Sequence, residues 1–198
     1  MSPDLSNPTP AASERRVVVA LAGRRIDSPE LARPRFPLSR LLGVREDIRR
    51  TLRAERAGML VAAAACGADL LALEVAGELG IRRRIVLPDQ PARFRKSSVI
   101  DRPGDWAASY DRLIAEVAQR GDLVVTDQGP GAPTPDYFQT NLDILDEAAR
   151  QAASLDWPLR VIVVWDGRSR GPDDVTAHFL AEARRRTLPV TEVLTVAH

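Results

Sequence analysis

The sequence predicts an α/β fold in which a doubly wound, mostly parallel sheet of six strands carries helices on both faces, in a single three-layer domain. Short β-branched and apolar runs alternate six times with segments whose apolar residues recur at helical spacing. The first of these runs, RVVVALA at 16–22, is typical of a strand buried on both faces. The 198 residues are enough for one domain with a substantial core.

The expected strands lie at 16–22, 58–64, 84–87, 123–126, 159–165 and 190–194, and the expected helices at 39–55, 69–79, 106–120, 137–155 and 173–186. Ser39 can cap the first helix, and Gly80 ends the second. Pro88 ends the third strand, and we expect a long loop over 89–105, a length that is often functional. Right-handed connections favour the strand order 3-2-1-4-5-6, with a switch point between the first and fourth strands.

Composition excludes several classes of function. The chain has 28 basic and 27 acidic residues, a balance that does not favour a general nucleic-acid or membrane surface. Cys66, the only cysteine, excludes an intrachain disulfide and a cysteine-based zinc site, and we expect no metal. No apolar run could span a bilayer and no signal peptide is recognisable, so we expect a cytoplasmic protein. Residues 1–14, rich in Pro and Ser, are predicted to be a disordered tail before a domain over 15–198.

The turn ACGAD at 65–69 connects the second strand to the next helix through small residues. The first N–H groups of a helix lack partners inside it, and the helix dipole places partial positive charge there. We therefore expect Gly67 and Ala68 to hold an anion such as phosphate, flanked by Arg24 or Arg25 from the loop after the first strand. The hydroxyl groups of Ser97 and Ser98 would join the phosphate, and Asp27 or Asn141 would contact a ribose or base. Asp69 either caps its helix or reaches a ribose hydroxyl.

Other polar residues follow the remaining strands, and the carboxyl ends of parallel strands meet at one edge of the sheet. Tyr137 and Asn141 share one face of a helix at its first turn, where Asn141 either links a loop or contacts a ligand. Trp106 and Tyr110 could stack a base, but core packing is the favoured interpretation. The predicted binding residues are Gly23, Arg24, Arg25, Asp27, Gly67, Ala68, Asp69, Ser97, Ser98, Asp127, Tyr137, Asn141 and Asp166.

A family resemblance is carried by ALAGRRID at 20–27, RPRFP at 33–37, ACGADLLALEVAGELG at 65–80, IVLP at 85–88, FRKSSV at 94–99, GDW at 104–106, Tyr137 with Asn141, and VWDG at 164–167. Together these segments resemble the SLOG superfamily, the Rossmann-like group that joins the DNA-processing protein DprA/Smf with the LOG enzymes, and its branch found beside bacterial signalling domains. The resemblance covers residues 16–196. It implies a Rossmann-like fold and a pocket for a nucleotide or nucleotide-derived ligand.

LOG enzymes cleave the N-glycosidic bond of nucleoside 5′-monophosphates and carry the motif PGGxGTxxE after a strand. The matching segment here, DQGPGAPTPDYFQTN, lacks the Gly-Gly-x-Gly-Thr turn and its glutamate. The leading hypothesis is therefore a module that binds or senses a nucleotide-derived ligand without a cofactor, rather than an enzyme. The alternatives are a nucleotide N-glycosidase, with Asp127 or Asp166 as its carboxylate, and DprA-like binding of single-stranded DNA. The resemblance also implies a homodimer and a signalling or effector partner protein.

Overall fold

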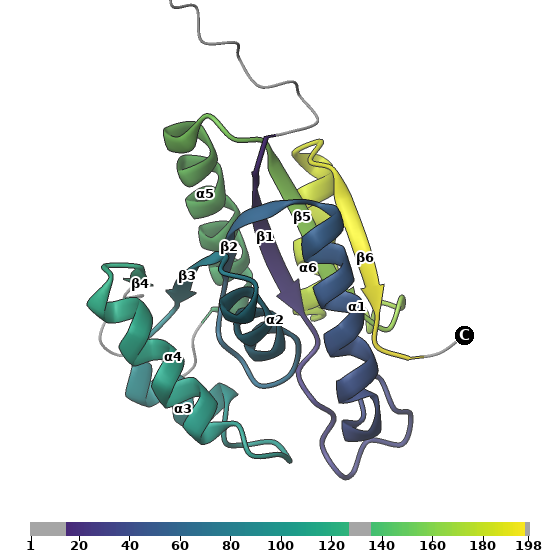
Figure 1. Ribbon diagram of the computed structural model, residues 1–198. Coiled ribbons are helices and arrows are strands. Elements are labelled where there is room, and N and C mark those ends of the chain that lie inside the picture. Colours follow the sequence, from purple (N-terminus) through teal and green to yellow (C-terminus); the bar gives the residue numbers. More distant parts are fainter. Residues whose placement is uncertain (1–14, 127–135, 197–198) are drawn as a thin grey trace, which may run out of the picture.

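The computed structural model describes residues 15–126 and 136–196, which alternate strands and helices along the chain (Figure 1). The strands are β1 (Val17–Gly23), β2 (Ala57–Ala62), β3 (Arg82–Leu87), β4 (Leu123–Val125), β5 (Leu159–Trp165) and β6 (Val190–Leu194). The helices are the 3-10 turn η1 (Leu38–Arg40), α1 (Leu41–Ala54), α2 (Ala68–Glu78), α3 (Pro91–Ser98), α4 (Ala107–Gln119), α5 (Tyr137–Leu155) and α6 (Val175–Arg185). This alternation confirms the predicted α/β class.

All pairings among the described strands are parallel, in the order β4-β3-β2-β1-β5-β6. The predicted order was wrong in one respect, because β4 pairs with β3 at the edge of the sheet and not with β1. The chain returns from β4 through α5, which packs across β1, β2 and β3, and continues on the other side of β1 in β5. The switch point therefore lies between β1 and β5, where ligands bind in sheets of this kind.

The two faces of the sheet bury separate hydrophobic cores. Successive side chains of β1 point to opposite faces, so Val19 and Leu21 enter one core while Val18 and Ala20 enter the other. The first core packs against α1, α2 and α4, and the second against α5 and α6 (Figure 1). The result is the predicted three-layer arrangement, a Rossmann-like domain with the loops after β1, β2 and β5 at one edge.

The predicted loop over 89–105 contains a helix, α3, which the sequence analysis missed. Pro91 occupies its first turn, where the missing N–H costs nothing, and Phe94 anchors the helix in the core. Trp106 and Tyr110, at the start of α4, are buried in the same core and donate hydrogen bonds to the backbone oxygens of Pro103 and Pro91. The core interpretation of these two aromatic residues is therefore correct.

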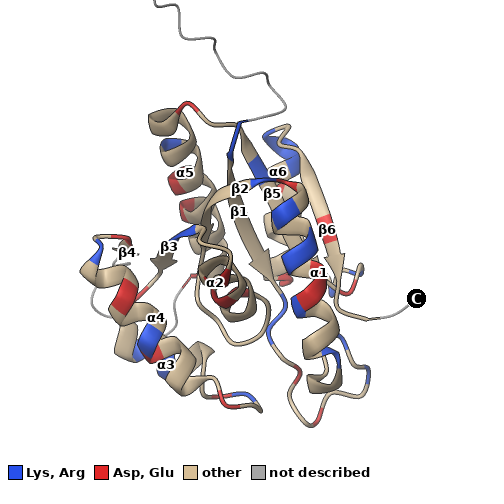
Figure 2. Cartoon of the chain, in the orientation of Figure 1, with Lys and Arg blue, Asp and Glu red and all other residues tan. Residues whose placement is uncertain are grey.

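Charged residues of both signs are interspersed over the helices and loops (Figure 2). Many of the arginines pair with a carboxylate, as Arg82 and Arg84 do with Asp122 at the amino end of β3. No helix in the described ranges is both long enough and apolar enough to cross a membrane.

Candidate functional site

A cavity of about 350 Å³ opens at the carboxyl edge of the sheet, beside the switch point. Its walls come from the loop after β1, the β2–α2 connection, α3 with the loop that follows it, and the first turns of α5 and α6. The polar lining comprises Arg24, Arg25, Asp27, Ser28, Arg35, Asp69, Ser98, Arg102, Tyr137, Thr140, Asn141, Arg170 and Thr176. Ala22, Ala63, Phe94, Ile144 and Val175 are among the apolar residues that line the remainder.

The turn before α2 is occupied by the chain itself. Gly67, with φ at +103°, forms an isolated antiparallel bridge with Arg25, and a Cβ at this position would lie 2.7 Å from the Arg24 oxygen. The amide of Ala68 donates to the Arg24 oxygen at 3.1 Å, and the amide of Cys66 donates to the Ser98 oxygen at 2.9 Å. Gly67 and Ala68 do not line the cavity, so their predicted role in holding phosphate has no support in this geometry. The glycine admits a neighbouring backbone rather than a ligand.

Arg24 is a structural cation under the cavity. Its Nε donates to Asp166 at 2.8 Å, and its two terminal nitrogens donate to Asp174 at 2.5 and 2.8 Å. Asp174 caps α6 by accepting the amides of Thr176 and Ala177. Burial alone would raise the pKa of Asp174, but the bonds from Arg24 and from backbone amides outweigh burial and lower it. This ion cluster joins the loop after β1 to the β5–α6 loop and leaves Asp166 outside the cavity lining.

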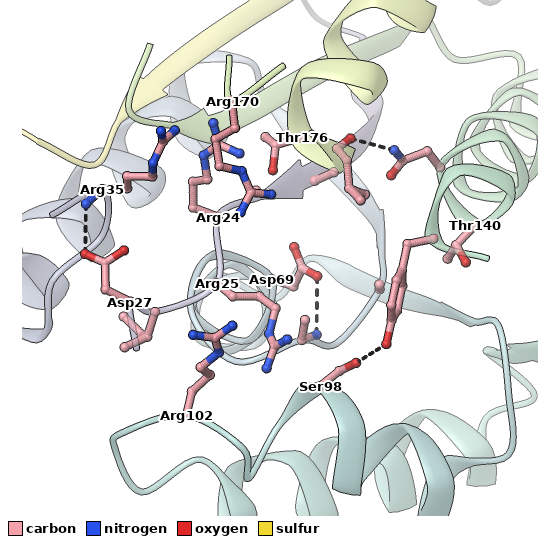
Figure 3. A pocket seen from close by; sticks show the side chains of 18 of the residues that line it. Arg24, Arg25, Asp27, Arg35, Asp69, Ser98, Arg102, Thr140, Arg170 and Thr176 are labelled. Carbon is pink, nitrogen blue, oxygen red and sulfur yellow. Dashed lines mark hydrogen bonds between the residues drawn. The ribbon is translucent and has the colours of Figure 1, made fainter. Parts of the chain in front are cut away.

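Three other arginines offer donors to the cavity. Arg25 and Arg102 lie side by side at its rim and share the carboxylate of Asp101 as their acidic partner (Figure 3). The Nε atoms of both are buried and donate no hydrogen bond to the described protein. Arg170 enters from the β5–α6 loop, with half of its side chain exposed and Asp174 at 3.5 Å. Because guanidinium groups bind phosphate oxygens with directed donors, this rim suits an anionic ligand.

Asp69 is the central acidic group of the cavity. Its Oδ2 accepts the amide of Ala65 at 3.3 Å, whereas Oδ1 is buried and accepts no hydrogen bond of good geometry from the described protein, although the Gly23 amide also favours the charged form of the carboxyl group. Burial raises the pKa of Asp69 to about 7, against the opposing effect of the amides of Ala65 and Gly23 and of the charge on Arg25. A carboxyl group held at such cost in the lining of a polar cavity is typical of a functional residue.

The opposite wall is formed where α3, α5 and α6 meet. The hydroxyl groups of Ser98 and Tyr137 lie 2.8 Å apart in a hydrogen bond that ties α3 to the first turn of α5. The side-chain nitrogen of Asn141 donates a hydrogen bond to the Val175 oxygen at 2.8 Å, which fixes the orientation of the amide group. Because Asn141 also lines the cavity, both roles considered for this residue are compatible with the geometry.

The structure brings most of the predicted binding residues to the cavity: Gly23, Arg24, Arg25, Asp27, Asp69, Ser98, Tyr137 and Asn141 line it. Ser97 and Asp166 do not, and Asp127 lies outside the described residues. Five further polar residues line the cavity but were not predicted from the sequence: Arg35, Arg102, Thr140, Arg170 and Thr176. The RPRFP segment pointed towards Arg35, but nothing distinguished Arg102 and Arg170 from the many other arginines. In the described ranges, no group of His, Cys, Asp or Glu side chains could hold a metal ion.

Comparison with protein-family models gives no match. Comparison with curated proteins gives none either. Among solved structures, the chain is similar to the X-ray structure of DNA processing protein A (DprA) from Streptococcus pneumoniae, with a TM-score of 0.41 and 13% sequence identity. The match covers 91% of this chain, which spans only 59% of the length of that protein. A likeness this distant concerns the course of the backbone and carries no information about function.

Proposed function

We propose that this domain binds a nucleotide or nucleotide-derived ligand in the cavity at the carboxyl edge of the sheet. The observation that carries the proposal is a set of three arginines in the lining, Arg25, Arg102 and Arg170, whose side chains stay 29%, 30% and 50% exposed and whose acidic partners, Asp101 and Asp174, do not line the cavity. Arg25 and Arg102 have unused, buried donors that a phosphate group would satisfy. The volume of about 350 Å³ falls within the range of small-molecule sites, which is about 300–1,000 Å³.

The remaining lining suits the other parts of a nucleotide. Asp69 and the Asn141 oxygen are acceptors for hydroxyl or amino groups, and the apolar side chains of Ile144 and Val175 lie at the same wall as Tyr137. A nucleotide combines an anionic phosphate, a ribose whose hydroxyl groups donate hydrogen bonds, and a flat base. The SLOG-like segments of the sequence imply the same class of ligand.

The test is isothermal titration calorimetry with nucleoside mono- and diphosphates, cyclic mononucleotides and cyclic dinucleotides at low salt. Arg102→Ala should weaken binding by about 10-fold or more, since a hydrogen bond to a charged group contributes about 1.5–3 kcal/mol. Arg25→Ala should have a similar effect. Arg95→Ala is the matched control, because its side chain is 31% exposed against 30% for Arg102 and it pairs with Asp111 rather than lining the cavity.

An absence of binding across the whole panel would contradict the proposal, as would an equal loss of affinity in Arg95→Ala and Arg102→Ala. For the N-glycosidase alternative, Asp166 is paired with Arg24 and Arg35 and does not line the cavity, while Asp127 lies outside the described residues. Release of free base from nucleoside monophosphates, detected by chromatography, would support this alternative. Retention of single-stranded oligonucleotide on a filter at low salt would favour the DNA-binding alternative instead.

A further inference from the structure

The unpartnered oxygen of Asp69 indicates which part of a ligand this residue contacts. In the described chain, the buried side-chain atoms without a hydrogen-bond partner are Asp69 Oδ1 and the Nε atoms of Arg25, Arg40 and Arg102. Three of these four residues line the cavity, and Asp69 is the acceptor among them. Asp69 is only 6% exposed, so a ligand donor that reaches Oδ1 would satisfy a group that the protein leaves unsatisfied.

The place of Asp69 in the cavity restricts the choice of donor. Figure 3 shows its carboxylate above the adjoining guanidinium groups of Arg25 and Arg102, with Thr140 across the cavity. A ligand phosphate held by the two arginines would place the next chemical unit of the ligand beside Asp69. In a nucleotide this unit is the ribose, while the base lies one unit further away, towards the wall of Tyr137 and Ile144.

Resting on the proposed function, we propose that Asp69 accepts a hydrogen bond from a ribose hydroxyl group and so makes the cavity selective for ribonucleotides over their deoxy counterparts. At pH 8, above its pKa of about 7, the Asp69 carboxyl group is mostly ionised and accepts hydrogen bonds, and a sugar hydroxyl is the donor nearest to the phosphate. A bound deoxy ligand would exclude water from Asp69 without donating a hydrogen bond to Oδ1. Loss of such a charged hydrogen bond corresponds to about 10- to 100-fold in affinity.

Calorimetry at pH 8 with the tightest-binding nucleoside 5′-mono- or diphosphate and its 2′-deoxy and 3′-deoxy forms tests this inference. In the unmodified protein, at least one deoxy form should bind about 10-fold or more weakly. In Asp69→Ala the ribonucleotide and both deoxy forms should agree within about twofold, as expected when the interacting pair is removed from a double-mutant cycle. Asp69→Asn, which keeps the size of the side chain and an acceptor for the Ala65 amide, should also reduce the difference.

Asp111→Asn is the control variant, because Asp111 pairs with Arg95 and does not line the cavity. It should keep the preference for ribose. Equal binding of all three ligands to the unmodified protein refutes the role of Asp69 while leaving the proposed function intact. A preference that persists in Asp69→Ala, or a preference for one base that disappears there, also overturns the inference. If no nucleotide binds at all, the proposed function itself is wrong.

Discussion

Replacing Arg24 with methionine tests whether the ion cluster under the cavity holds the fold together. The side chain of Arg24 is 4% exposed, and those of Asp166 and Asp174 are 8% and 0% exposed. Methionine keeps most of the volume and flexibility of the arginine stem but removes all its donors. The variant therefore leaves two buried carboxylates without their main cation.

The expected cost follows from the contacts that survive. Breaking a buried ion pair from one side costs about 3–5 kcal/mol, because the remaining charge stays buried without compensation. Asp174 keeps the amides of Arg170, Thr176 and Ala177, and Asp166 keeps Arg35 at 3.2 Å. We therefore expect a loss of about 3–4 kcal/mol, towards the lower end of that range. Domains of ordinary size have about 5–15 kcal/mol in total, so the loss is large.

Urea unfolding at pH 7 measures this loss, with the free energy of unfolding extrapolated to water. Arg35→Met is the control, since its side chain is 25% exposed and should cost about 1 kcal/mol or less. Adding Asp174→Asn to Arg24→Met should recover part of the loss, because asparagine removes the charge and still caps α6. A loss below about 1 kcal/mol in Arg24→Met, or no recovery in the double variant, would refute the structural role of the cluster.

Three further predictions concern stability. Asp69→Asn should stabilise the protein by up to about 4 kcal/mol at pH 8 and by much less at pH 4.5. Because the folded pKa of about 7 lies above the unfolded value of about 4, the stability that the protonated Asp69 contributes is fully present at low pH and is lost as the pH rises to about 7. Equal urea midpoints of the variant and the unmodified protein at pH 8 would contradict this prediction. Asp174→Asn should be less stable than the unmodified protein at pH 7, and this difference in stability should disappear as the pH falls below about 4. The reason is that the folded pKa of Asp174 is lowered, so the stability that the ionised carboxylate contributes is lost on protonation. A difference in urea midpoint that does not change with pH would refute this. Gly67→Ala should lower the melting temperature much more than Gly80→Ala, because both glycines have positive φ but only the Cβ at 67 would collide with backbone, and equal shifts in calorimetry would argue against the close packing of this turn.

The class of fold was predictable because the spacing of apolar residues within a segment shows which of its faces is buried. For each strand and long helix this spacing can be read from the segment alone, without knowledge of its neighbours in space. The eight residues of α3 are too few to show a period, and their arginines, lysine and serines resemble a loop. The position of β4 beside β3 was not predictable, since the order of strands along the chain does not determine which of them pair. Arg24 is recognisable as a cation at the edge of the sheet, but its neutralisation depends on Asp166 and Asp174, more than a hundred positions away. The burial of Asp69 Oδ1 without a hydrogen bond likewise depends on how the folded chain packs around it, and no pattern in the sequence indicates it.

The arginines around the cavity differ in how far the domain depends on them. Arg24 belongs to the interior, whereas Arg102 and Arg170 extend from connecting loops with 30% and 50% of their side chains exposed. Substitutions at these two outer positions would leave the architecture undisturbed while altering which molecule is admitted. The buried ion cluster that supports the cavity is therefore separate from the loop residues at its entrance. A small library of substitutions at positions 102 and 170 would be the natural starting point for changing which ligand the domain binds.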